Sequence, residues 1–393
     1  MREGRAASER RQYGCVSGYA IVLAVAAGVT LLLTPLARWL SFRTKMVVAP
    51  DEGRVHTRPL PVLGGLSMFL GFLAGMGAAT QLKQFDPVFA GTSEPLAILI
   101  GASLTFLVGL VDDAKELSPP AKMAGQVLAA SLMSLLGVTM LYFKVPFLGF
   151  FSLSPDQAPL VTVLWVIVMA TAVNYIDGLD GLAAGITAIA AASFALYSDR
   201  LFDQGLLPNE SNSISPLIAV IVLGMCVGFL PWNFHPAKII MGDSGALLLG
   251  TLMAVATLLV GGQTASSTSG STFFFFAPLI IPLIILGVPV FDFLFATVRR
   301  AAKRSGVTVR SRDHLHDRLL RIGHGHRRAV LILWAWSAIL CGLVLYPVYT
   351  DKGNGVVPFA AAALAVALYT VLHPEVRRQR ADQLELDWEK QTH

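Results

Sequence analysis

The residues best suited to chemistry lie in an eight-residue block, Asn174 to Gly181, which reads Asn-Tyr-Ile-Asp-Gly-Leu-Asp-Gly. The block separates two apolar runs, each about long enough to cross most of a bilayer. Asp177 and Asp180 are three positions apart, so on a helical turn they share one face. Carboxylates at a membrane edge are costly unless compensated, and they are usually functional. The alternative is a plain turn between helices, where Asp and Gly are common.

A second acidic group, Asp112-Asp113, directly follows an apolar run, and Lys122 follows it after a Pro-Pro pair. Adjacent carboxylates repel each other, so either one is protonated or a cation holds both. A polar turn that ends a helix explains one Asp better than two. The pair therefore favours a functional interpretation.

A third acidic motif contains Asp243, which stands between glycines in the sequence Met-Gly-Asp-Ser-Gly, shortly after a loop that contains Asn233. Such an Asp can simply cap the start of a helix. A helix N-terminus also binds phosphate, and a carboxylate together with a phosphate commonly holds Mg²⁺. Both interpretations stay open for Asp243, and Asn233 is a candidate for substrate binding.

Two further loops carry groups that could bind an anion. The first contains Arg54 and His56 and leads into a turn at Gly64-Gly65, where the chain can approach a ligand closely. On its own, this loop is equally typical of a basic segment that sets membrane topology.

The second basic loop contains His314, His316 and Arg318. Two histidines at alternate positions suit two donors converging on an anion, rather than a zinc pair one helical turn apart. Most of the Lys and Arg in this loop is juxtamembrane positive charge. His324 and His326 are expected to be interfacial residues.

The composition predicts an all-α polytopic membrane protein. The chain of 393 residues is 54% hydrophobic and 14% charged, whereas soluble domains carry roughly 25% charged residues. The net charge of +5 is explained by the loops, and no nucleic-acid partner is expected. We predict an N-terminal tail (1–15), a transmembrane catalytic domain (16–373) and a cytoplasmic C-terminal tail (374–393). Eleven spans are expected: Val16–Leu40, Val62–Thr80, Pro95–Val111, Met123–Tyr142, Leu160–Tyr175, Leu182–Tyr197, Ile214–Leu230, Gly245–Gly261, Phe273–Phe295, Ala329–Tyr349 and Val356–Leu372.

The charge distribution predicts the orientation of these spans. Most of the Lys and Arg residues fall in the loops after the odd-numbered spans and in the C-terminal tail. The positive-inside rule therefore places these loops, and every candidate site residue, at the cytoplasmic face. Four arginines of the N-terminal tail conflict with this orientation, but the loop after the ninth span outweighs them.

Together, these motifs resemble the polyprenyl-phosphate N-acetylhexosamine-1-phosphate transferase family, which includes the phospho-MurNAc-pentapeptide transferase. The matching segments are Gly109–Asp113, Asn174–Gly181, Pro236–Lys238 with Met241–Gly245, and His314–His316. The resemblance implies Mg²⁺-dependent transfer of a sugar-1-phosphate, most simply GlcNAc-1-phosphate, from a UDP-N-acetylhexosamine to polyprenyl phosphate, with release of UMP. It implies a bacterial inner membrane protein with its active site facing the cytoplasm. Mn²⁺ is an alternative metal, and a homodimer is left open.

The resemblance also implies roles for individual residues. Asp243 matches the magnesium ligand, with the amide oxygen of Asn174 as second ligand. The positions that match catalytic or substrate-side residues are Asp112, Asp113, Asp177, Asp180 and Lys122. Those that match substrate-binding positions are Arg54, His56, Gly64, Gly65, Asn233, His314, His316 and Arg318.

At Asp317 the sequence departs from the pattern, because relatives usually carry a further His there. Two alternatives remain: the pentapeptide branch of the family, and a secondary transporter. A transporter would place its charges near the midplane between repeated halves, whereas no repeat is visible here. Pro289 to Asp292 and the Arg-rich loop favour the GlcNAc-1-phosphate branch.

Overall fold

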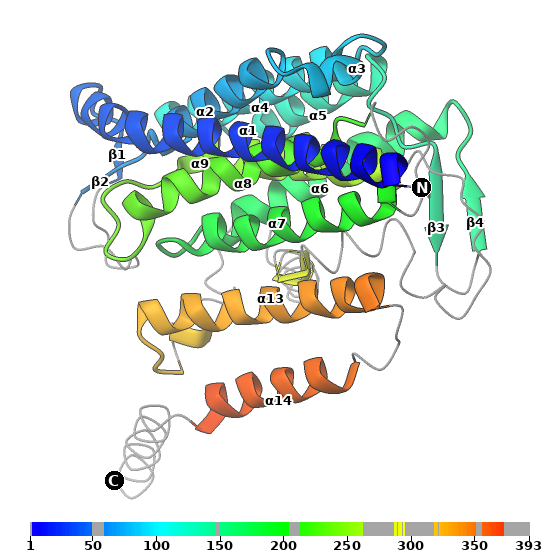
Figure 1. Ribbon diagram of the computed structural model, residues 1–393. Helices are drawn as coiled ribbons and strands as arrows, with labels where there is room; N and C mark the ends of the chain where they lie inside the picture. The colour runs from blue at the N-terminus through cyan, green and yellow to red at the C-terminus, as the bar shows by residue number, and fades with distance from the viewer. Residues whose placement is uncertain are drawn as a thin grey trace, which may run out of the picture.

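The computed structural model describes residues 2–48, 59–145, 149–203, 213–261, 287–288, 290–292, 294, 318–320, 322–350 and 356–372. These residues are mostly helical, in keeping with their long apolar runs. The helices are α1 (Arg2–Arg43), α2 (Gly64–Ala79), the 3₁₀ helix η1 (Lys83–Phe85), α3 (Asp86–Phe89), α4 (Glu94–Lys115), α5 (Pro119–Leu135), α6 (Gln157–Ile176), α7 (Leu182–Asp203), α8 (Ser215–Asn233), α9 (Gly242–Gly261), α13 (His326–Thr350) and α14 (Val356–Leu372). Figure 1 shows the long helices running roughly parallel or antiparallel to one another.

The prediction of a multi-pass α-helical membrane protein is confirmed, but the count of eleven spans is not. Within the described residues, seven helices are long and apolar enough to cross a membrane, and a bent pair formed by Gly64–Ala79 and Lys83–Ala90 could add an eighth. The expected span Met123–Tyr142 is shorter than predicted, because α5 ends at Leu135 and Gly137 follows with φ +109°. Most of the expected span Phe273–Phe295 lies outside the described residues.

Two short antiparallel hairpins were not expected from the sequence. Strand β1 (Val47–Val48) pairs with β2 (Leu60–Pro61), and β3 (Tyr142–Val145) pairs with β4 (Gly149–Ser152). They lie at opposite ends of the helices (Figure 1). The sequence predicts Tyr142 as the end of a membrane span and places Leu60 and Pro61 in a loop, because strands this short leave no period-2 pattern.

Helix α9 lies at the centre of the bundle. Of its membrane-length segment, 94% is buried, and it packs against α2, α4, α6 and α8. Small residues allow these close contacts, as is typical of membrane helices: a Cβ added at Gly250 would lie 2.5 Å from the Cα of Ala170 in α6. The start of α9 is therefore held from several sides.

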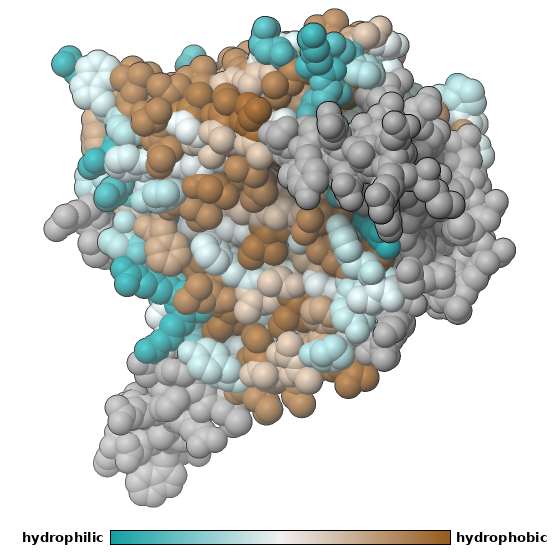
Figure 2. All heavy atoms as spheres, viewed as in Figure 1, coloured by the Kyte–Doolittle hydropathy of each residue, from teal (hydrophilic) through white to brown (hydrophobic). Residues whose placement is uncertain are grey.

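The outside of the bundle is apolar. Leu32, Leu135, Leu160 and Leu164 are all more than half exposed, which suits contact with lipid rather than water. Figure 2 shows a broad hydrophobic face, with hydrophilic atoms at the left edge, where β1, β2 and several helix ends lie, and at the top, near α3.

The order of the helices brings the candidate residues together. Because consecutive long helices run in opposite directions, the ends of α4, α6 and α8 and the starts of α5, α7 and α9 reach the same end of the bundle (Figure 1). All described candidate residues from Asp112 to Asp243 are carried by these helix ends or by the turns between them. This confirms that the acidic motifs share one side of the molecule.

Candidate active site

The centre of the site is the ammonium group of Lys122, near the start of α5. Its Nζ lies 2.7 Å from Asp112 Oδ2 at the end of α4, and it also pairs with Asp243 Oδ2 at the start of α9. Burial alone would lower the pKa of Lys122, but the carboxylates of Asp243 and Asp112 outweigh that effect and raise it. Lys122 is therefore firmly cationic and neutralises part of an acidic cluster.

Asn174, on the last turn of α6, completes this cluster. With its amide oriented to suit both neighbours, its Nδ2 donates to Asp243 Oδ1 (2.9 Å) and its Oδ1 accepts from Lys122 Nζ (3.0 Å). Asn174 and Asp243, the two residues predicted to bind the metal, are thus in direct contact. Asn174 belongs to α6 and Asp243 to α9, so the two residues are far apart in the sequence.

Asp113 has a different position from its neighbour Asp112. Its Oδ1 accepts from the backbone N–H of Asp243 (2.7 Å), and its Oδ2 accepts from that of Ser244 (3.0 Å). These are N–H groups at the start of α9, which the helix itself leaves without partners. Asp113 therefore caps α9 from another helix, and the resulting charge-assisted hydrogen bonds fix Asp243 in place.

Close backbone packing also holds the start of α9. The N–H of Gly65 donates to Met241 O (2.8 Å), and a Cβ added at Gly65 would lie 2.4 Å from Gly245 N. Gly242 has φ +70°, a conformation that glycine adopts without strain. Gly64 and Gly65 are predicted to form a turn that approaches a ligand closely. In the structure they begin α2, where Gly65 lies against α9 and Gly64 lies against Ile240 and Phe229.

Gly109 gives a direct test of this packing. A Cβ there would lie 2.4 Å from Ser244 Cα and 2.5 Å from Ser244 N, so we expect Gly109→Ala to lower the free energy of unfolding by about 1–3 kcal/mol. Gly77→Ala is the matched control, because nothing lies within 4 Å of a Cβ at Gly77. Thermal unfolding in detergent measures both. Equal midpoints for the two variants would contradict the packing argument.

Asp177 lies in the turn after α6, beside the same cluster. Burial, together with the carboxylates of Asp243, Asp113 and Asp180, raises the pKa of Asp177 to about 8. Its carboxyl group is therefore protonated at neutral pH unless a cation nearby favours the ionised form. Asp177 could thus respond to a cation bound by its neighbours.

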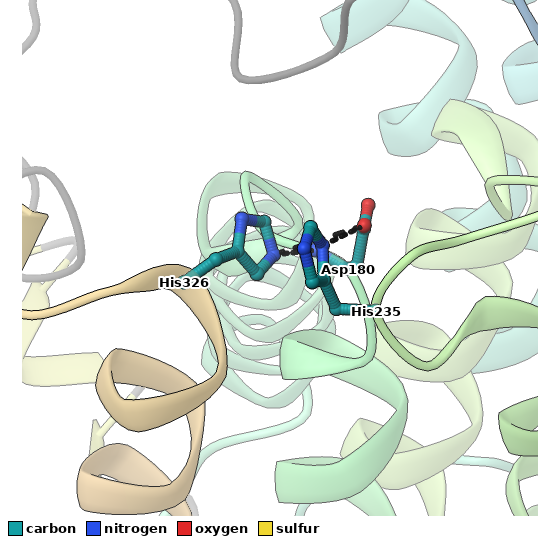
Figure 3. A group of neighbouring side chains, drawn as sticks. All are labelled: Asp180, His235 and His326. Carbon is teal, nitrogen blue, oxygen red and sulfur yellow. Dashed lines mark hydrogen bonds and ion pairs between the residues drawn. The ribbon is translucent and has the colours of Figure 1, made fainter.

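Asp180 faces a different set of groups from Asp177. Its carboxylate is buried, and Oδ2 lies 2.7 Å from His235 Nδ1 and accepts from the N–H of Ala237 (3.1 Å). The backbone N–H of Asp180 donates to His326 Nε2 (2.9 Å). Figure 3 shows the three side chains, with both rings close to Asp180. Neither His235 nor His326 was among the predicted site residues, and His326 was expected to be interfacial.

Asn233, predicted to bind substrate, is buried at the end of α8. Its Oδ1 accepts from the N–H of Gly181 (2.9 Å), and its Nδ2 donates to Ile239 O (3.0 Å). These bonds tie the turn after α6 to the loop before α9. Arg318 lies in the short described segment 318–320, with a half-buried side chain. Arg54, His56, His314 and His316 lie outside the described residues, so their predicted roles stay predictions.

The donor atoms of the central cluster fit a hard divalent cation. Asp112, Asn174 and Asp243 all offer oxygen atoms, and Mg²⁺ prefers carboxylate and amide oxygens to nitrogen or sulfur. The same oxygens now surround one Lys ammonium. Asp243 and Asn174 would hold the metal, as the family resemblance implies.

Comparison with known proteins identifies the family. A family model described as glycosyl transferase family 4 matches residues 95–261, the segment from α4 to α9 that carries the whole described cluster. A decaprenyl-phosphate N-acetylglucosaminephosphotransferase of Mycobacterium leprae is 35% identical over 92% of this chain and 91% of its own. The chain belongs to glycosyl transferase family 4.

Two less similar relatives show how broad the similarity is. An undecaprenyl-phosphate alpha-N-acetylglucosaminyl 1-phosphate transferase of Thermotoga maritima is 28% identical over 80% of this chain and 87% of its own. A phospho-N-acetylmuramoyl-pentapeptide-transferase of Desulforudis audaxviator is 31% identical over 83% of this chain and 98% of its own. The resemblance inferred from the motifs is therefore confirmed.

Proposed function

We propose that this family 4 member transfers N-acetylglucosamine-1-phosphate from UDP-N-acetylglucosamine to a polyprenyl phosphate, with release of UMP. The observation that carries the proposal is the convergence of Asp112, Lys122, Asn174 and Asp243 at one end of a membrane bundle. The names of the relatives from M. leprae and T. maritima support the same donor group and the same class of lipid acceptor.

The cluster suits a reaction between two anions. The donor diphosphate and the acceptor phosphate repel each other, so the site has to supply positive charge and hold both in line. Bound Mg²⁺ would neutralise the donor diphosphate and polarise its phosphorus–oxygen bonds. Asp243 and Asn174 would hold that ion, and Lys122 would supply a second positive charge for the acceptor phosphate. Asp112 would orient Lys122.

The proposed reaction does not require a strong general base among these residues. The acceptor phosphate is already ionised near pH 7, so its attacking oxygen needs orientation more than deprotonation. Asp113 acts on the reaction through the start of α9, which it caps. Its part in the proposed mechanism is to keep Asp243 in position, rather than to contact the substrate.

The proposal is tested by finding which bond of UDP-GlcNAc breaks. We expect label in the sugar-linked phosphate of UDP-GlcNAc to move to the polyprenyl lipid, with one UMP released for each product. This follows because attack at phosphorus leaves UMP, whereas attack at the anomeric carbon would leave UDP. The measurement is separation of labelled lipid from nucleotide after incubation with Mg²⁺. Label found in released UDP would refute the proposal.

The donor sugar is tested in the same assay. Assaying UDP-GlcNAc, UDP-GalNAc and UDP-MurNAc-pentapeptide under identical conditions ranks them by kcat/KM. We expect UDP-GlcNAc to be preferred, in line with two of the three relatives named above. A preference for the pentapeptide donor would instead favour the activity named for the D. audaxviator relative.

The proposed orientation places the site at the cytoplasmic face of a bacterial inner membrane. Ser118 is exposed at the start of α5, beside the cluster, and Thr92 is exposed at the opposite end of the bundle, before α4. In a Cys15→Ser background, we expect an impermeant thiol reagent added to intact cells to label Thr92→Cys but not Ser118→Cys. The reverse pattern would invert the topology.

A further inference from the structure

A second polar cluster joins α13 to the turns that carry the catalytic carboxylates. It consists of Asp180, in the turn after α6, His235, in the loop before α9, and His326, the first residue of α13. Figure 3 shows the His326 ring reaching from α13 towards the other two side chains. The two imidazole rings are stacked, with centroids 4.1 Å apart.

The hydrogen bonds define the protonation of both histidines. A backbone N–H can only donate, so His326 Nε2 must be an unprotonated acceptor and the ring is neutral. His235 Nδ1 lies 2.7 Å from Asp180 Oδ2, a contact that a proton on Nδ1 donates to the carboxyl oxygen. The contacts thus form a directed chain with one defined tautomer at each histidine.

Helix α13 contacts both segments at once through consecutive residues. His326 accepts from Asp180 N–H in the turn after α6, and Arg327 Nε donates to His235 O in the loop before α9 (3.1 Å). That turn also contains Asp177, and that loop leads to Asp243. The first turn of α13 therefore fixes the spacing between two carboxylate-bearing segments.

Close packing against α7 holds α13 in position for this role. Trp334 of α13 packs directly over Gly185 of α7, where an added Cβ would lie 1.9 Å from the indole. The Trp334 ring also contacts Phe234, with centroids 5.9 Å apart. Because α13 is anchored on α7 about two turns beyond His326, the imidazole is presented at a fixed place.

We propose that His326 and His235 are positioning residues, which hold the Asp177–Gly181 turn in register with Asp243 through Asp180. The inference rests on the proposed function, since its purpose is to align the transfer site. It also explains the burial of Asp180: its backbone and carboxylate serve as the attachment point for α13 and for the loop before α9.

The same three residues could in principle bind a metal ion, because one donor atom of each lies within 4.8 Å of the others. In the structure, however, these atoms already have hydrogen bonds. His235 Nδ1 pairs with Asp180 Oδ2, which also accepts from the N–H of Ala237, and His326 Nε2 accepts from the N–H of Asp180. A metal would have to replace those bonds and displace the His235 proton. The observed pairing therefore favours a clamp made of hydrogen bonds.

Three substitutions at His326 distinguish the effect of losing the hydrogen-bond acceptor from the effect of losing the stacked ring. His326→Gln places an acceptor oxygen close to the Nε2 position, His326→Phe keeps the stacked ring without an acceptor, and His326→Asn places its polar group at the Nδ1 position. We expect Gln to retain at least half of the wild-type kcat. Phe and Asn should lower kcat about 10- to 100-fold, the usual effect of losing a group that orients a catalytic residue, with KM for UDP-GlcNAc within about twofold.

Hydrogen exchange supplies a readout that does not depend on the reaction. In full-length protein in detergent, amide exchange in the peptide spanning 174–182 should accelerate in His326→Phe and stay slow in His326→Gln, because only the former frees the Asp180 N–H. If the wild-type protein transfers no labelled phosphate, the proposed function fails, yet this exchange pattern still tests the clamp.

Three results would overturn the inference: wild-type kcat and exchange in His326→Phe, equal damage in Gln and Phe, or a stoichiometric transition metal in purified wild-type protein that both variants lose. At His235, Asn keeps a donor at the Nδ1 position and Leu does not. Wild-type activity is expected to be retained in His235→Asn and lowered in His235→Leu. Equal activity of the two would remove His235 from the clamp.

Discussion

Asp243→Asn is expected to remove almost all transfer activity while leaving the protein folded. The Asp243 carboxylate contacts both Lys122 and Asn174 at the start of the central helix. Loss of a charged metal ligand removes several kcal/mol of transition-state stabilisation. A loss of about 4 kcal/mol corresponds to a ~10³-fold fall in kcat. The measurement is single-turnover transfer of labelled phosphate to the lipid at saturating Mg²⁺.

The fold should tolerate this change for two reasons. Asp113 caps the start of α9 through backbone N–H groups, and these bonds do not depend on the Asp243 side chain. The substitution also removes one of several carboxylates that raise the pKa of Asp177. We therefore expect a thermal midpoint near the wild-type value. Near-normal turnover with unchanged Mg²⁺ dependence would rule out Asp243 as the metal ligand.

Asp113→Asn is the informative comparison for Asp243→Asn. The amide offers one acceptor oxygen in place of two, so one of the two N–H groups at the start of α9 loses its partner. Asp113→Asn should therefore lower both stability and activity, whereas Asp243→Asn should lower activity alone. The adjacent aspartates Asp112 and Asp113 thus act through different neighbours, one through Lys122 and the other through α9.

The convergence of the acidic motifs could be predicted from the sequence. Each motif follows or precedes an apolar run, and alternate ends of successive membrane helices face the same side. Asp112, Asn174 and Asp243 meet because α4, α6 and α9 pack together. The motif spacing and the charge bias were sufficient for that conclusion. They do not reveal which oxygen faces which partner.

The separate structural roles of the polar residues could not be predicted from the sequence. Asp113 contacts Asp243 across 130 positions of sequence, and Asn233 binds the backbone of Gly181 rather than acting from the loop surface. Local sequence shows that such residues are polar and lie near the site. Only the packing of distant helices determines whether a carboxylate caps a helix, binds a cation or anchors a turn.

His326 shows the same limit in a different way. In the sequence it stands beside Arg327 and Arg328, in a basic segment at a membrane edge, which is typical of an interfacial residue. In the structure its ring is buried, and its Nε2 reaches Asp180. Whether His326 is interfacial or buried depends on where α13 packs on α7. The residues next to His326 in the sequence do not indicate that packing.

Lys122→Gln is expected to lower transfer activity about 100-fold while strengthening metal binding. The ammonium contacts the same three side chains, Asp112, Asn174 and Asp243, that could surround a divalent cation. Two unit charges 4 Å apart repel by about 4 kcal/mol at an effective dielectric constant of 20. Removing the ammonium should therefore tighten Mn²⁺ binding at least about tenfold, measured directly by electron paramagnetic resonance of free Mn²⁺.

Stability without metal provides a second measure of this competition. In Lys122→Gln the carboxylates of Asp112 and Asp243 lose their cationic partner, and breaking such a partly buried pair is destabilising. Its thermal midpoint should therefore fall in EDTA and rise more steeply with added Mg²⁺ than that of the wild type. Lys115→Gln is the matched control, because Lys115 has the same charge but is exposed at the end of α4. Unchanged or weaker Mn²⁺ affinity in Lys122→Gln would show that the lysine supports the metal site instead of competing for its oxygens.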